Sequence, residues 1–352
     1  MYRTAIVVGN VVAQRAIFKK IQQRRIVSQL SRSMVSRLDP LDWALICELC
    51  GNARMPYKEL AKKFNISDNT VKNRINNLRQ RGVIRRFGVC VSFETFGAEN
   101  VVGFITTDGS ENVIELMKQI VSKPMVVEIY RTSDRRYEYH AIVLGASETL
   151  GLKRFLSELD GVTNVEMRPV FFLFPNKPPN YVLNTRGKRV TFTREQLRVL
   201  KSLAENDSRL PVSQIAQYTG FTPRRVRKIL RDLEESGGIH FPVYYDVFAL
   251  GDMEYRMRIC YDEAQTTGQD IIMGLHEKYP ELFWWASITT NEPIIDVGLI
   301  IDRPGKGPPI AAEIKAADYT ESVEDFVSYP RVVHGINRLN AHLWDLINEA
   351  GL

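Results

Sequence analysis

One segment of the chain occurs twice, and this internal repeat restricts the possible folds more than any other feature of the sequence. Residues 57–84 align with residues 212–239 at a constant offset of 155. At the aligned positions apolar residues meet apolar residues and glycine meets glycine: Leu60 and Ile215, Ala61 and Ala216, Val71 and Val226, Ile75 and Leu230, Leu78 and Leu233, and Gly82 and Gly237. A repeat of this length predicts duplicated domains.

The first copy of the repeat has the pattern of two helices joined by a tight turn. In the first helix Leu60, Ala61 and Phe64 are apolar on one side. Asn65 can take the turn, and Ser67 is a natural N-cap for the second helix because its hydroxyl can accept a hydrogen bond from a first-turn amide. The segment therefore predicts a helix-turn-helix.

The second helix of this motif separates apolar from polar side chains. Val71, Ile75 and Leu78 recur at helical spacing and face the core. The outward row consists of amides and a lysine, namely Asn69, Lys72, Asn73 and Asn76. Asparagine pairs with adenine in the major groove, and lysine meets guanine or phosphate. A strand with Arg85 and Arg86 follows as a wing, so the segment predicts DNA binding; a solvated surface helix is the alternative.

The second copy of the repeat has a different polar face. Thr222 is the expected N-cap of its second helix, with Pro223 in the first turn. The outward residues of that helix are basic, namely Arg224, Arg225, Arg227, Lys228 and Arg231. This composition favours phosphate anchoring over base reading, and the strand at 239–242 has no arginine. Protein contact is the alternative for this copy.

Each copy is followed by a stretch in which strand and helix patterns alternate. Residues 99–174 read as β-α-β-β-α-β, an antiparallel sheet with two helices on one face. Residues 252–343 repeat this order less cleanly, with a longer helical insertion at 305–329 and a last strand at 332–344. The expected fold class is α+β, with two winged helix-turn-helix domains that are each followed by a ferredoxin-like βαββαβ domain.

These patterns also set the expected domain boundaries. They are a basic arm at 1–37, winged helix-turn-helix domains at 38–92 and 193–246, ferredoxin-like domains at 98–175 and 252–343, a proline-rich linker at 176–192 and a tail at 344–352. Three interpretations of the arm stay open: a disordered segment or a product of an upstream start codon, because Met34 precedes the first clear element; a helix that packs or touches DNA; and a targeting peptide.

Composition excludes several classes of protein. A chain of 352 residues with 44% hydrophobic content can bury the cores of two or three domains. The net charge of +6 comes from the first 38 residues, which hold eight basic and no acidic residues, so local clusters carry the nucleic-acid argument. No run approaches the roughly 20 apolar residues of a membrane helix. We expect a cytoplasmic protein without a membrane partner.

Four scattered cysteines indicate a reducing compartment rather than a disulfide framework. Cys47 and Cys50 form one CxxC inside an expected helix at 40–50, where helix packing explains them better than metal binding. The sequence offers no phosphate-binding glycine loop and no zinc signature. We therefore expect no metal and no cofactor.

The segment from residue 38 resembles the N-terminal domain of the Lrp/AsnC (feast/famine) transcription regulators. The resemblance is carried by LDPLDWALICELC, KELAKKFNIS, TVKNRINNLRQRGVI and the basic strand after them. It implies a sequence-specific regulator, not an enzyme, whose DNA contacts lie at Ser67, Asp68, Asn69, Thr70, Lys72, Asn73 and Arg74, with Arg85 and Arg86 in the wing. The implied partner is double-stranded DNA, and in duplicated form the chain is a monomeric pseudo-dimer or a homo-oligomer.

Residues 99–174 resemble the effector-sensing domain of the same family, which is an oligomerisation platform that binds an amino acid between subunits. The candidate effector-binding residues lie around the loop between the second and third strands, at Thr132, Ser133, Asp134, Tyr137 and Glu138. This loop departs from the family's Thr-Gly-x-Tyr-Asp type signature, because Ser133 replaces the glycine and Glu138 the acid. A plain charged hairpin loop is the alternative to an amino-acid-like effector site.

Two alternatives to a DNA-binding regulator remain. Siroheme decarboxylases resemble Lrp/AsnC proteins in fold and act on a tetrapyrrole with His and Arg of the sensing domain. The corresponding residue types here are His140, His240, His276, His334, His342, Arg131, Arg135, Arg136 and Arg168. Two retained basic recognition helices argue against such an enzyme. The other alternative is an adaptor that uses its winged helices for protein contact.

Overall fold

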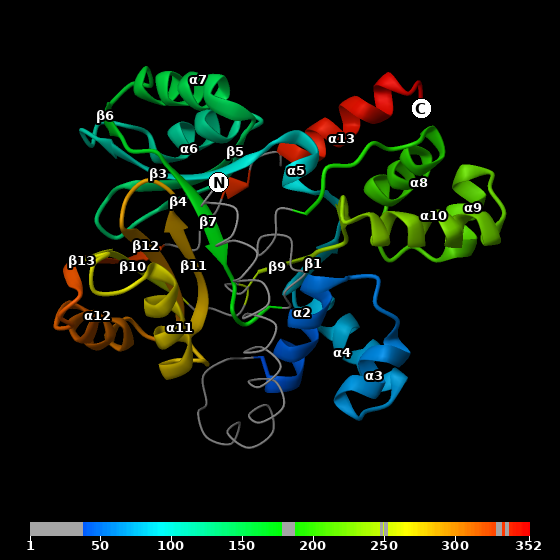
Figure 1. Cartoon of the computed structure of the whole chain (residues 1–352), viewed down its shortest axis with the longest axis horizontal. Coiled ribbons are helices and arrows are strands. Elements are labelled where there is room, and N and C mark those ends of the chain that lie inside the picture. The colour runs from blue at the N-terminus through cyan, green and yellow to red at the C-terminus, as the bar shows by residue number, and fades with distance from the viewer. Residues whose placement is uncertain (1–37, 178–186, 247–248, 250–252, 329–332, 335–337) are drawn as a thin grey trace.

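The computed structural model describes residues 38–177, 187–246, 249, 253–328, 333–334 and 338–352 (Figure 1). The predicted basic arm at 1–37 and most of the predicted linker lie outside these residues, and residues 187–192 form neither helix nor strand. Among the helices of the described residues, none combines the length and the apolar character that a membrane crossing requires.

The first helical unit, residues 38–92, is built on three helices. They are α2 (Pro40–Gly51), α3 (Tyr57–Phe64) and α4 (Asp68–Gln80), followed by the strand β1 (Ile84–Phe87). Asp39 is the N-cap of α2, and its carboxylate accepts a 2.8 Å hydrogen bond from the amide of Asp42. α3 ends at Asn65, where a left-handed backbone (φ 54°) makes the turn. The predicted helices and turn are confirmed.

The second helical unit, residues 193–246, has the same order of elements. It contains α8 (Arg194–Glu205), α9 (Val212–Thr219), α10 (Pro223–Ser236), β8 (Ile239–His240) and β9 (Val243–Tyr245). Thr193 and Gln196 form a capping box at the start of α8. α10 starts at the predicted Thr222 cap with Pro223 at its first position, and it ends at Gly237 in a left-handed conformation (φ 70°).

The two helical units share one hydrophobic core. Buried residues of the first unit such as Leu45 and Ile75 belong to the same cluster as Leu200 and Leu230 of the second. β1 pairs antiparallel with β9, and β2 (Cys90–Val91) pairs with β8. The predicted wing strand is therefore present, but it pairs with a strand of the other unit.

The first half of the sheet follows the predicted order. A short helix α5 (Phe93–Phe96) precedes β3 (Glu99–Thr107), α6 (Val113–Val121), β4 (Val126–Arg131), β5 (Tyr137–Val143) and α7 (Gly145–Ser157). The predicted last strand is divided into β6 (Val162–Val165) and β7 (Arg168–Leu173). Both pair with β3, so the division bends the strand without ending the sheet.

The second half of the sheet corrects one prediction. Its elements are β10 (Met253–Tyr261), α11 (Gly268–Lys278), β11 (Phe283–Thr289), β12 (Ile294–Ile301), the 3₁₀ turn η3 (Pro304–Lys306), α12 (Gly307–Lys315) and β13 (Thr320–Ser328). The predicted long helix at 305–329 is wrong beyond residue 315. β13 pairs with β10 along its length and buries the alternate residues Phe326 and Ser328, so sheet pairing overrides its acidic, helix-tolerant composition.

The C-terminal prediction is also wrong. Among the described residues of this segment the strand is limited to β14 (Val333–His334), and α13 (Arg338–Glu349) occupies most of the segment predicted as strand and tail. Leu339, Leu343 and Ile347 are buried at four-residue spacing, which is a helical period. Leu343 and Ile347 belong to the core of the two helical units, so α13 is part of the fold rather than a tail.

The ten strands that the described residues form outside the two helical units belong to one sheet. Its order is β13-β10-β12-β11-β7-β3-β5-β4-β14, with β6 also paired to β3. β13 and β14 stand at opposite ends of this order but are neighbours in the chain, and Ser328 bridges to Thr132 next to β4. The sheet therefore returns on itself. Helices α6 and α7 pack on its first half and α11 and α12 on its second, while α2–α4 and α8–α10 lie beside it (Figure 1).

Candidate nucleic-acid interface

α4 is held firmly at its start and along its inner side. The Ser67 hydroxyl accepts a 3.1 Å hydrogen bond from the amide of Thr70 and lies 2.8 Å from the Thr70 hydroxyl oxygen. Asp68 occupies the first turn, where the helix dipole favours a carboxylate. Val71, Ile75 and Leu78 are buried, as their spacing predicts. These contacts fix which side chains α4 presents to solvent.

The residues predicted to point outward lie at the surface of α4. Ser67, Asp68, Asn69, Lys72, Asn73 and Asn76 are exposed and Thr70 is half-buried, and Asn77, Arg79 and Gln80 are exposed in the last turn. Three amides and one lysine give this face many hydrogen-bonding groups and little net charge. Such a face suits the edges of bases better than a row of phosphates.

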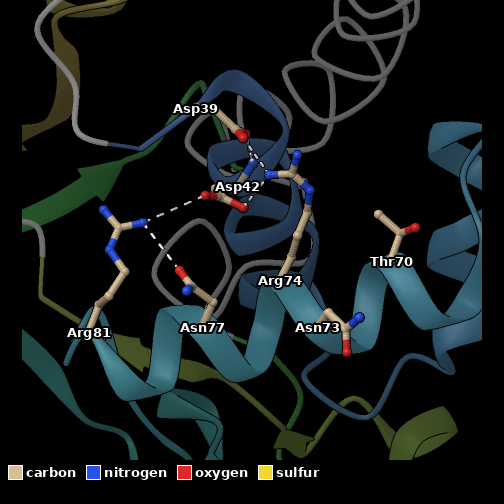
Figure 2. A pocket seen from close by; sticks show the side chains of 7 residues that line it. All are labelled: Asp39, Asp42, Thr70, Asn73, Arg74, Asn77 and Arg81. Carbon is tan, nitrogen blue, oxygen red and sulfur yellow. Dashed lines mark hydrogen bonds and ion pairs between the residues drawn. The ribbon is translucent and has the colours of Figure 1, made fainter.

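Arg74 turns from this face toward α2. Its guanidinium donates to Asp39 and, at 2.8 Å, to Asp42, as Figure 2 shows. Burial acts to raise the pKa of Asp39, but the hydrogen bonds from Arg74 and from the Asp42 amide, together with the charge of Arg74, outweigh burial and hold this pKa below its usual value. Arg81 lies 4.0 Å from Asp42 on the same side. The hollow between α2 and α4 is lined by Asp39, Asp42, Thr70, Asn73, Arg74, Asn77 and Arg81 (Figure 2).

The two wing arginines have protein partners and remain exposed. Arg85 forms an ion pair with Asp246, which follows β9. The guanidinium of Arg86 lies 4.4 Å from the ring centre of Tyr244 on β9. Both contacts cross from the first helical unit to the second. The DNA contacts predicted for Arg85 and Arg86 would therefore be made by side chains that also join the two helical units.

α10 exposes a more basic face than α4. Thr222 caps it by accepting a 3.2 Å hydrogen bond from the amide of Arg225, and the predicted residues Thr222, Arg224, Arg225, Arg227, Lys228 and Arg231 are all exposed. Arg225 also donates to Glu195 at 2.9 Å. The remaining cations give α10 an electrostatic face suited to phosphate groups.

The helical architecture matches known DNA-binding proteins. A family model described as winged helix-turn-helix DNA-binding matches residues 38–85. The HTH-type transcriptional regulator Ptr1 of Methanocaldococcus jannaschii is 31% identical over 124 residues, which cover 34% of this chain and 80% of Ptr1. The chain belongs to the family of HTH-type transcriptional regulators. The predicted DNA-binding regulator is confirmed at this level, and its duplicated Lrp/AsnC form stays a prediction.

One solved structure shares the fold of this regulator over most of the chain. The siroheme decarboxylase NirDL covers 88% of this chain and 100% of its own, with a TM-score of 0.57 and 13% identity. This likeness concerns the fold alone. AsnC of E. coli covers 38% of this chain with a TM-score of 0.31 and 22% identity, too small a likeness to carry an argument.

The five candidate effector-binding residues of this regulator make contacts inside the protein. The Ser133 amide donates to the carbonyl of Val327 on β13 at 2.9 Å, and the Ser133 hydroxyl accepts from the Val327 amide at 3.0 Å. The other four residues also have partners within the protein. Thr132 is buried and donates to Asp134, which also accepts a hydrogen bond from Arg136. Tyr137 donates to Glu111, and Glu138 forms an ion pair with Arg256. The loop has a positive φ at Arg135 (71°) and not at Ser133, the residue that replaces the family's glycine.

A buried ionic network that was not predicted from the sequence joins the two halves of the regulator's sheet. Arg256 is 5% exposed and pairs with Glu138 of the first half and with Glu254 of its own half. Arg258 lies 2.9 Å from Asp296 and 3.3 Å from Glu166 of the first half. Burial raises the pKa of Glu138 to about 7, although Arg256 acts to lower it. The sequence pattern could have indicated this network, because Glu254, Arg256 and Arg258 occupy alternate positions of one strand and so lie on the same face of the sheet.

Lys177 of the predicted linker lies in a cluster of aromatic rings that was not predicted from the sequence. Its side chain is fully buried, and its ammonium lies 4.3 Å from the ring centre of Trp43 and 4.7 Å from that of Trp284. It also donates to the Cys47 sulfur at 3.5 Å. Burial raises the pKa of Cys47 and raises that of Cys50 to about 12, so both thiols stay neutral and pack as apolar groups.

Proposed function

We propose that this regulator binds a specific duplex DNA sequence with α4 in the major groove and anchors itself on a second DNA segment through α10. The observation that carries the proposal is the capped, exposed amide row of α4, Asn69, Asn73 and Asn76. An asparagine that pairs with adenine discriminates against a wrong base by about 1–3 kcal/mol. Ser67 caps the Thr70 amide, and the positive end of the helix dipole at this N-terminus would attract a phosphate of the DNA backbone.

The role of α10 is phosphate anchoring. Its exposed face presents five cations, of which Arg225 is shared with Glu195. Contacts to phosphates position a protein on DNA without reading its sequence, and each neutralised phosphate makes the affinity for DNA depend more strongly on salt concentration. We therefore assign sequence selectivity to α4 and sequence-independent affinity to α10.

The chain is best explained as a tandem regulator that binds as one chain. The proposed domains are two winged helix-turn-helix units at 38–92 and 193–246, each followed by a ferredoxin-like half at 98–175 and from 252 onward, with α13 closing the core. A shared core, exchanged strands and one continuous sheet support a monomeric pseudo-dimer. Because the two recognition helices differ, the bound site is asymmetric. For residues 132–138 we infer an internal structural role.

A selection from a randomised duplex library tests the proposal. The purified chain is compared with Lys72→Ala/Asn73→Ala on α4 and with the matched control Lys118→Ala/Gln119→Ala, which removes an exposed Lys and its neighbouring amide from α6. Wild type and control should enrich one sequence, and the α4 variant should lose that enrichment. The experiment is run at two salt concentrations, and the higher should weaken binding strongly.

Two results would contradict the proposal. Enrichment of nothing, together with a Soret shift when a tetrapyrrole is added, would favour an enzyme like siroheme decarboxylase, whose fold the chain shares. DNA binding that is weak and nearly independent of salt would favour a protein-interaction adaptor.

A further inference from the structure

Two arginines exchange hydrogen bonds between the helical units. Arg54, in the loop between α2 and α3, donates to the backbone carbonyl of Ser208 and, at 3.5 Å, to that of Leu210. Arg209, in the loop between α8 and α9, donates to the carbonyl of Ala53 and, at 3.1 Å, to that of Met55. Each guanidinium therefore binds the loop that carries the other.

The exchange is reciprocal at the offset of the sequence repeat. Arg54 aligns with Arg209, and the acceptor residues Ala53 and Met55 align with Ser208 and Leu210. Backbone hydrogen bonds flank the exchange in the same way, because the Ala53 amide donates to the carbonyl of Phe241 and the Ser208 amide to that of Phe87. Contacts that match about a pseudo-two-fold axis place both loops in one defined arrangement.

Both guanidinium groups are held in place rather than solvated. Arg54 and Arg209 are half-buried, and burial lowers the pKa of each, yet an arginine remains charged. Arg209 also lies 4.5 Å from the ring centre of Tyr57, and Arg54 lies 5.6 Å from that of Phe241. A planar guanidinium fixed by two carbonyls and a ring transmits orientation better than a flexible ammonium would.

The exchange lies where it sets the relative position of the recognition helices. The loop of Arg54 leads into α3 and the turn before α4, and the loop of Arg209 leads into α9 and the turn before α10. A displacement of either loop therefore moves the helix-turn-helix that follows it.

We propose that Arg54 and Arg209 are positioning residues that fix the separation and rotation of α4 and α10, and thereby the spacing of the two DNA segments that one chain binds at once. This inference rests on the proposed function. If α4 and α10 are held rigidly, the second helix meets its DNA segment at a high effective concentration once the first is bound. If they are held loosely, the chain accepts many spacings of the two segments but gains less affinity from binding both.

The test measures spacing preference on the duplex that the wild type selects. Five base pairs, about half a helical turn, are inserted between the segments that contact α4 and α10. The insertion should weaken wild-type binding by at least about tenfold. In Arg54→Ala/Arg209→Ala the same insertion should lower the affinity by less than about threefold. This variant should bind a duplex that contains the α4 segment alone with the affinity of wild type. Arg54→Lys/Arg209→Lys should fall between them, and the control Arg154→Ala on α7 should match wild type.

Each outcome decides the inference. Equal spacing penalties in wild type and the alanine variant would overturn it while leaving the proposed function intact. A wild type that binds the α4 segment without any spacing preference would also overturn the inference, and of the proposed function it would leave only the readout by α4. A wild-type chain that selects no DNA would remove the proposed function itself.

A distance measurement in the absence of DNA tests the inference even if the alanine variant binds DNA poorly for another reason. Spin labels at the aligned exposed positions Lys62→Cys and Gln217→Cys, in a Cys260→Ser background, report the distance between α3 and α9. The distance distribution should be narrow with both arginines present and broad in Arg54→Ala/Arg209→Ala. An unchanged distribution would overturn the inference.

Discussion

The amides of α4 and the guanidinium groups of α10 should make two separable kinds of DNA contact. Asn73→Ala is expected to cost about 1–3 kcal/mol on the selected sequence and little on others, because it removes a base-reading group. Arg231→Ala should weaken binding to all sequences and lower the salt slope by about one, because it removes a phosphate contact. Titrations on matched and scrambled duplexes at several salt concentrations measure both. Equal loss of selectivity in the two variants would contradict the division of roles.

Glu138 should make stability depend on pH. Its pKa of about 7 lies above the ordinary value of 4.5, so the folded state holds the proton more tightly than the unfolded state. The resulting stabilisation is fully present below pH 4.5 and is lost as pH rises through about 7. Over this range the free energy of unfolding should fall by at most about 3 kcal/mol.

Glu138→Gln keeps the shape of the protonated carboxyl and should lack this decline. Urea unfolding of both proteins at pH 5 and pH 8 measures it. Burial of His240 lowers its pKa to about 4, which acts in the opposite direction below pH 6.5, but His240 is common to both proteins and cancels in the comparison. Parallel pH dependence in the two proteins would show that Glu138 is not the group responsible.

At the residue scale the sequence predicted outward positions well and partners poorly. Helical spacing placed Lys72 and Asn73 at the surface because that depends only on local geometry. It could not predict that Arg74 turns to Asp39 and Asp42, which lie more than thirty positions upstream. Such contacts depend on how helices pack, which no local pattern contains.

The first turns of the two recognition helices make a prediction at the scale of elements. Ser67→Ala and Thr222→Ala each remove the side-chain acceptor of an N-cap and should lower the free energy of unfolding by about 1 kcal/mol. Exposed Ser157 on α7 caps no helix, so Ser157→Ala should change stability much less. Urea unfolding measures all three. Equal effects at the three positions would contradict the capping role.

Elements with strong local signals were predicted correctly, and elements defined by pairing were not. α4 and α10 were predicted because their caps, apolar spacing and terminal glycines agree. β13 was missed because its acidic residues suit a helix in isolation and only pairing with β10 makes it a strand. α13 was missed because the four-residue spacing of Leu339 and Leu343 was interpreted as part of a strand.

At the scale of the whole molecule, shared packing should make unfolding cooperative. The helical units have one core, and the sheet halves are joined by β7–β11 and β4–β14 pairing and by buried ion pairs. We expect one thermal transition with equal calorimetric and van't Hoff enthalpies. Two separate transitions would show that the halves fold independently.

The repeat at an offset of 155 predicted two similar units, but it could not predict how they associate. β1 has the same sequence pattern whether its partner is β2 or β9, and the structure pairs it with β9. The return of the sheet on itself likewise depends on the pairing of the edge strand β14 with β4, which lies about two hundred positions earlier in the chain. Such pairings are properties of the whole molecule and leave little trace in any one segment.

The central claim is that one chain presents two unlike recognition helices to one DNA site. Hydroxyl-radical footprinting of the selected duplex, with the stoichiometry measured by sedimentation, tests it most directly. We predict one 40.3 kDa chain per duplex and two protected segments about one helical turn apart, with only the segment at α4 sensitive to base changes. A palindromic site bound by two chains, with both halves equally sensitive to base changes, would contradict the claim.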